Sequence, residues 1–136
     1  MNEFNLPKQY NWQKASTPIV KKYVANLIQS GVGNAPTAFE LQNDTDVYFT
    51  YEYIAPGIYT ATASKPIFEG VYPFENSKVI ISITNPSIMS NFGGYSVFVT
   101  PVTPDTFTIY SSNLVAFVDD ILGQATQNTI EITIYP

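Results

Sequence analysis

Few side chains in this sequence are of the types that usually carry out catalysis. The chain contains no His, no Cys and no Arg. Without His it lacks the usual general base and the commonest metal ligand, and without Cys it has no thiolate. Without Arg it cannot hold a phosphate group in the bidentate manner. No Ser has a His to activate it, and no Gly-rich phosphate loop follows a strand and opens a helix.

Carboxylates are the remaining candidates for a chemical site. The segment Asn43-Asp44-Thr45-Asp46 offers oxygen ligands for Ca²⁺, but it lacks the Gly and the distal Glu of an EF-hand loop, and turn chemistry explains it better. Asp119 and Asp120 are neighbours, so on an extended chain they point to opposite faces. Glu52 and Glu69 would suit the catalytic pair of a glycosidase only if the fold brought their carboxylates close together. We therefore expect no enzyme activity, no metal site and no cofactor.

The two parts of the chain differ in charge. Residues 1–22 carry four Lys and one acid, a balance of +3, whereas residues 23–136 carry two Lys and ten acids, a balance of −8. Nucleic-acid binding by the acidic part is disfavoured, because it requires clustered cations. We expect residues 1–22 to form an extended arm that contacts a partner through aromatic rings and ammonium groups. The candidate binding residues are Phe4, Lys8, Tyr10, Trp12, Lys14, Lys21 and Lys22.

The alternative for these residues is a leader that is only partly ordered against its own domain. Residues 23–136 suit one domain. Aromatic residues make up 15% of the chain and charged residues 12%, which favours a packed core rich in Tyr and Phe. No apolar run approaches the length of a membrane span, and the N-terminus lacks the apolar core of a secretory signal, so we expect no membrane insertion.

The strongest structural pattern runs from Asp46 to Ala63. Residues alternate with the period of two that is typical of strands, with Val47, Phe49, Tyr51 and Tyr53 on one face. Ala55-Pro56-Gly57 then breaks the run, because Pro and Gly suit the two central positions of a type II turn. The pattern predicts an antiparallel hairpin in which Phe49 and Tyr51 are mostly buried.

Further strands are predicted on both sides of this hairpin. Residues 19–29 also match helical spacing, but their β-branched content and the Gly-rich loop after them favour a strand. We expect Phe39 and Leu41 to point inward and the centre of 78–84 to be buried on both faces. Residues 65–76 should form a packed connection. The predicted strands are 19–29, 37–42, 46–54, 58–64, 78–84, 95–100, 106–110, 115–118 and 129–135, with the last one inside the sheet.

About eight short strands with regularly spaced turns describe an all-β fold. We predict an antiparallel β-sandwich, jelly-roll-like, in preference to a small barrel, with an extended N-terminal arm. Parallel βαβ units are excluded because no crossover helices are predicted.

Several segments in a fixed order resemble a known family. These are Leu27-Ile28-Gln29-Ser30-Gly31, Asn34-Ala35-Pro36-Thr37-Ala38, Tyr51-Glu52-Tyr53, Gly57-Ile58-Tyr59-Thr60-Ala61 and the terminal Asn128-Thr129-Ile130-Glu131-Ile132-Thr133-Ile134-Tyr135-Pro136. Together they resemble a β-rich module of tailed bacteriophage virion proteins, notably of phages of Bacteroidetes hosts and crAss-like phages. The resemblance covers residues 23–136 and leaves the arm outside.

This resemblance implies a structural protein of the virion, such as a capsid decoration protein or a head or tail fibre subunit, and it supplies no catalytic residues. Other virion proteins are then the expected partners, and the arm is the natural element of attachment. We also expect a homo-oligomer, with a trimer as the first model, because apolar loops at 65–76 and 85–94 would otherwise be exposed. A carbohydrate-binding module is the alternative, with host-surface glycans stacked on exposed coplanar rings.

Overall fold

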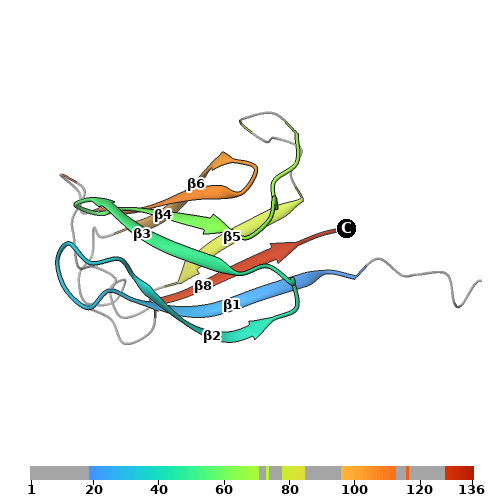
Figure 1. Ribbon diagram of the computed structural model, residues 1–136, viewed down its shortest axis with the longest axis horizontal. Helices are drawn as coiled ribbons and strands as arrows, with labels where there is room; N and C mark the ends of the chain where they lie inside the picture. The colour runs from blue at the N-terminus through green and yellow to red at the C-terminus, as the bar shows by residue number, and fades with distance from the viewer. Residues whose placement is uncertain (1–18, 71–72, 74–77, 85–95, 113–115, 117–127) are drawn as a thin grey trace, which may run out of the picture.

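The computed structural model describes residues 19–70, 73, 78–84, 96–112, 116 and 128–136. These residues form an all-β structure in which two four-stranded antiparallel sheets pack face to face (Figure 1). The predicted sandwich is therefore confirmed. The strands are β1 (Lys21–Ile28), β2 (Thr37–Asn43), β3 (Phe49–Ala55), β4 (Ile58–Ala63), β5 (Val79–Thr84), β6 (Ser96–Thr103), β7 (Thr106–Ser112) and β8 (Asn128–Ile134). The described part of the chain contains no helix, and so none that is long and apolar enough to cross a membrane.

The first sheet has the order β2-β1-β8-β5. Strand β8 lies between β1 and β5 and pairs with both, so the last strand of the chain is inside the sheet, as predicted (Figure 1). Strand β1 pairs with β2 on its other side, and a bulge between Val24 and Ala25 leaves Leu41 of β2 without an opposite residue. In this sheet β2 and β5 are the edge strands.

The second sheet has the order β3-β4-β7-β6 and contains the predicted hairpin as β3 and β4. Gly57 has φ = 70°, the left-handed conformation that the predicted turn requires of it. Strands β6 and β7 form a second hairpin around Pro104 and Asp105, again as the spacing indicates. Pro101, which lies within β6, is tolerated because β6 is an edge strand.

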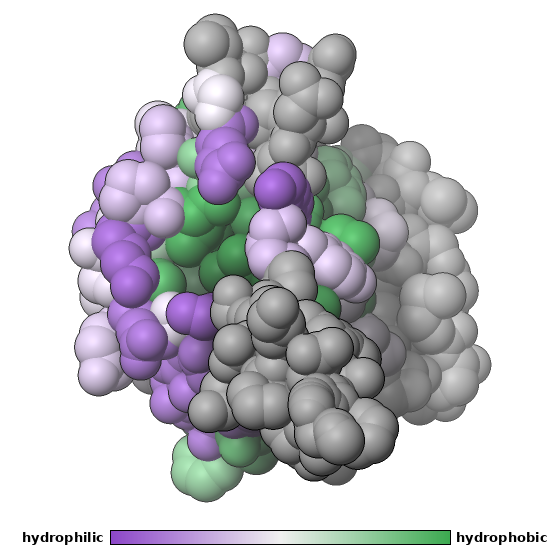
Figure 2. All heavy atoms as spheres, turned by 90° about the vertical axis from the view of Figure 1, so that its right-hand side faces the viewer, coloured by the Kyte–Doolittle hydropathy of each residue, from purple (hydrophilic) through white to green (hydrophobic). Residues whose placement is uncertain are grey.

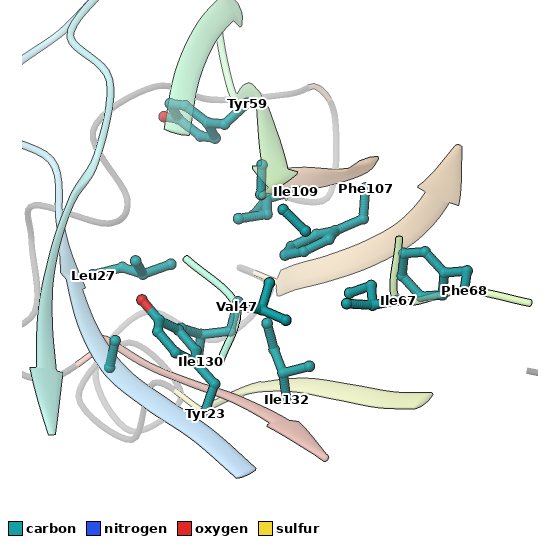
Figure 3. Close-up of a cluster of buried hydrophobic side chains, with 13 residues drawn as sticks. Tyr23, Leu27, Val47, Tyr59, Ile67, Phe68, Phe107, Ile109, Ile130 and Ile132 are labelled. Atoms are coloured by element: carbon teal, nitrogen blue, oxygen red, sulfur yellow. The ribbon is translucent and has the colours of Figure 1, made fainter. Parts of the chain in front are cut away.

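The core lies between the sheets and takes alternate residues from the four interior strands (Figure 3). Ile67 and Phe68 close it at one end, and their backbone N–H groups both donate to the carbonyl oxygen of Pro104, at 2.8 and 2.9 Å. The packed connection predicted for 65–76 is thus confirmed for these two residues. The core residues from the strands are Tyr23, Ala25, Leu27, Tyr59, Ala61, Ala63, Phe107, Ile109, Ile130 and Ile132, with Val47 beside them. Phe49 and Tyr51 are partly buried against this core.

Two predictions of burial were wrong, and both concern edge strands. Phe39 and Leu41 were expected to point inward, but they are 67% and 54% exposed. Phe39 lies opposite Asn26, which is not a core residue of β1. Strand β5 was expected to be buried on both faces at its centre, but it alternates, and Ile80 is 58% exposed. An edge strand has one neighbour instead of two, so its outward apolar residues stay uncovered.

Some predicted elements lie outside the described residues. These are the loop 85–94, most of the strand 115–118, and the pair Asp119 and Asp120.

Candidate functional site

The candidate binding residues of the N-terminal arm fall into two groups. Phe4, Lys8, Tyr10, Trp12 and Lys14 lie outside the described residues. Lys21 and Lys22 are the first residues of β1, so the boundary expected after residue 22 falls inside this strand.

Lys22 is engaged within its own domain. Its Nζ lies 3.0 Å from Oε1 of Glu131 on the neighbouring β8 and donates a hydrogen bond to it. That hydrogen bond and the charge of the carboxylate raise the pKa of Lys22. Lys22 therefore forms part of the sheet surface, and its ammonium group already has an anionic partner.

The most exposed regular element is strand β2. Residues 37–42 are all exposed, and only Asn43 at its end is partly buried. The strand pairs with β1 on one side, and the described part of the chain places no strand on its other side, as Figure 1 shows. Phe39 and Leu41 stand on this open strand. An exposed edge strand of seven residues that carries two large apolar side chains is a surface on which another strand can pair.

A rigid acidic turn follows β2. Oδ1 of Asn43 accepts hydrogen bonds from the backbone N–H of Thr45, at 3.0 Å, and from its Oγ1, at 2.7 Å. Nδ2 of Asn43 donates to the carbonyl oxygen of Val47, at 2.9 Å. These bonds are those of an Asx turn, so the turn interpretation of this segment is confirmed. The exposed carboxylates of Asp44 and Asp46 project from this turn, and Glu40 of β2 is exposed beside it.

The other carboxylates form no site within the described residues. Glu52 and Glu69 are both exposed, but Glu52 belongs to β3 and Glu69 to the connection after Phe68. In the described part of the chain no three Asp or Glu side chains come together in a way that would hold a metal ion.

The outer face of the second sheet carries many threonines and one pair of rings. Phe98 of β6 lies opposite Tyr110 of β7, with ring centroids 5.0 Å apart and planes at 18°. Because the rings stack on each other, each covers one face of the other. This pair therefore does not present the flat platform of coplanar rings that sugar binding would use.

A small apolar hollow lies on the side of the sandwich where β5 and β6 run. Phe68, Val79, Ile81, Val99 and Pro101 line it, and its volume is about 170 Å³. Figure 2 looks onto the end of the sandwich and shows apolar side chains lying deeper than the hydrophilic ones around them. Small-molecule sites usually occupy about 300–1,000 Å³, so the hollow is smaller than a typical ligand pocket.

Two tyrosine hydroxyls meet inside the sandwich. The hydroxyl of Tyr51 is buried next to that of Tyr23, but the two do not reach hydrogen-bond geometry. Burial raises the pKa of Tyr51 far above its ordinary value, and the neighbouring Tyr23 adds to this. Burial also raises the pKa of Tyr23. Both phenols therefore stay neutral, which suits structural side chains better than an acid or base for catalysis.

Comparison of the chain with protein-family models, with curated proteins and with solved structures finds no match. Sequence reasoning placed the candidate site in the arm and did not identify β2, because it took Phe39 and Leu41 for core residues. The available signal was the acidic turn directly after β2, since Glu40, Asp44 and Asp46 mark that end of the strand as solvent-facing.

Proposed function

We propose that this chain is a structural protein of a bacteriophage virion, a capsid decoration protein or a head or tail fibre subunit, that works by assembly and not by catalysis. The observation that carries the assembly role is the exposed edge strand β2 with Phe39 and Leu41. The bulge at Leu41 and the charge of Glu40 limit pairing between identical edges, but two large apolar side chains stay exposed on the strand and no described segment covers them.

The composition of the chain supports assembly as well. Residues 1–22 are basic and the remainder is acidic. Opposite charges on two parts of one chain favour head-to-tail contact between copies, and they steer the encounter at low salt. The virion assignment itself comes from the resemblance of residues 23–136 to β-rich virion modules, and self-association, with a trimer as the first model, follows from the same resemblance.

Two measurements test this function. Light scattering at micromolar concentration should give the mass of an oligomer for the full chain, and deletion of residues 1–18 should reduce it to the monomer mass with an unchanged β-sheet circular dichroism spectrum. The full-chain association should weaken with added salt. A monomer mass for the full chain would contradict self-assembly.

The virion location needs a separate measurement. Mass spectrometry of gradient-purified phage particles from the host that carries the gene should detect peptides of this chain at a fixed ratio to the major capsid protein. Peptides that are abundant in the lysate but missing from purified particles would overturn the assignment.

A further inference from the structure

The open side of β2 has the properties of a surface that accepts an added strand. Its seven residues have one strand partner within the described part of the chain, and six of them are exposed. In this mode of binding, backbone hydrogen bonds supply affinity and alternate side chains supply specificity. Phe39 is exposed by the regular alternation of the strand. Leu41 is the extra residue of the bulge, and its exposed side chain adds a second apolar group to the edge.

The charge of this edge selects the incoming strand. Glu40 lies on the strand, and Asp44 and Asp46 follow it, all three exposed. If β2 of one copy paired antiparallel with β2 of another about its central residue, the two Glu40 side chains would face each other, and like charges that face each other across strands are destabilising. The edge therefore favours an occupant that is cationic and has the alternation of a strand.

The arm of the same chain meets both requirements. From residue 4 to residue 14 the even positions hold apolar or basic side chains, and the odd positions hold only Asn, Gln and Pro7. This is the period of two of a strand. Lys8 and Lys14 provide two cations for the acidic edge. Pro7 lacks an N–H group, but it is an odd-numbered residue. The backbone groups of the odd residues can face away from β2 while those of the even residues form the hydrogen bonds with it.

The direction of the chain indicates that the arm comes from another copy. The start of β1 lies beside the end of β2, since Tyr23 is opposite Asn43. An arm that folded back along its own β2 would run parallel to it, whereas the arm of a second copy can run antiparallel, and antiparallel pairing is more stable per residue. We propose that residues 4–14 of one copy add to the β2 edge of a second copy as an antiparallel strand. This inference deepens the proposed function and depends on it, because it specifies how the copies associate.

A pair of matched variants tests the edge in the full chain. Leu41→Lys places a cation on the proposed docking strand, where it repels the basic arm and interrupts the apolar surface. Ile80→Lys makes the same change on β5, the opposite edge of the same sheet, where Ile80 has similar exposure (58% against 54%). We expect Leu41→Lys to weaken self-association about ten-fold or more by light scattering, and Ile80→Lys to leave it unchanged. Both variants should keep the β-sheet circular dichroism spectrum.

Failure of this inference can be distinguished from failure of the proposed function. If the full chain is an oligomer and the two variants behave alike, β2 is not the docking edge, while assembly itself stands. If the full chain is a monomer, both proposals fall. Should Leu41→Lys lose the β-sheet spectrum, the crosslinking experiment below decides, because it keeps Leu41.

Crosslinking identifies the donor, since the chain has no native Cys. One tagged chain carries Asn11→Cys in the arm, and a second, differently tagged chain carries Gln42→Cys on β2. A short bismaleimide should join the two chains after mixing, and the control pair of Asn11→Cys with Ser82→Cys on β5 should stay unlinked. In a chain that carries both Asn11→Cys and Gln42→Cys, a link that forms only within the chain, or no link at all, would overturn docking between copies.

Discussion

Phe107 is the residue whose removal should cost the domain most. Its side chain is fully buried near the start of β7, between the two sheets (Figure 3). The ring of Phe49 packs against it at a centroid distance of 6.2 Å, and the ring of Phe68 meets it edge-on at 6.4 Å. These contacts come from β3 and from the connection that closes one end of the core. Phe107→Ala would therefore open a cavity where three separate parts of the chain meet.

The expected loss follows from burial and cavity formation together. Transfer of a Phe side chain out of water contributes about 1.5–3 kcal/mol, and the cavity that remains in a rigid core raises the cost of Phe→Ala to about 3–5 kcal/mol. A chain of 136 residues has a free energy of unfolding of roughly 7–20 kcal/mol, at about 0.05–0.15 kcal/mol per residue. Phe107→Ala should remove a large part of this free energy and leave the fold recognisable.

Urea unfolding followed by circular dichroism measures this change. The midpoint should fall while the slope stays near that of the unchanged chain, because the surface exposed on unfolding is nearly the same. Phe98→Ala is the control, since its ring is 46% exposed on the outer face and stacks on its cross-strand neighbour Tyr110. It should cost about 1 kcal/mol. A loss below about 1 kcal/mol for Phe107→Ala, or equal losses for both variants, would refute the packing described here.

Two further variants test the turn and the buried phenols. Gly57→Ala forces an L-residue into φ = 70° and should cost about 1–2 kcal/mol, seen as a lower urea midpoint; an unchanged midpoint would contradict the turn geometry. Tyr51 has a raised pKa in the folded protein, so above the unfolded pKa near 10 only the unfolded chain releases the proton. The contribution of Tyr51 to stability is therefore fully present below about pH 10 and is lost as the pH rises above that value. Tyr51→Phe should therefore lose less stability between pH 9 and 11 than the unchanged chain, in a pH series of urea midpoints, and equal losses would show that Tyr51 ionises freely in the fold.

The hairpin strands β3 and β4 and the terminal strand β8 were predictable from the sequence because their local signals agree with one another. In β3 and β4 the period of two, the Pro-Gly turn and the β-branched residues all indicate a hairpin, and Gly57 has the required conformation. In β8 the alternation of Ile130, Ile132 and Ile134 with polar residues is equally clear. In each of these strands the apolar set of residues faces the core.

The burial of strands β2 and β5 was not predictable in the same way. Alternation shows which residues share a face, but it does not show whether a further strand lies alongside. Phe39 and Ile80 are as apolar as core residues, yet each is exposed because it lies on the outer face of an edge strand. The bulge opposite Val24 and Ala25 adds a second difficulty, since a single unpaired residue shifts the faces of everything after it. Sheet order and bulges depend on pairing between distant segments, which a local pattern does not encode.

The arrangement separates the residues that hold the domain together from those that we propose for assembly. The core that contains Phe107, Ile109 and Ile130 lies between the sheets, whereas Phe39 and Leu41 stand on the edge of one sheet and belong to no core cluster. Changes in groups without shared partners usually act independently. Substitutions on the edge can therefore change association with little effect on the free energy of unfolding of the single domain. For a protein that must fold first and assemble afterwards, this separation allows the domain to be complete before the edge is filled.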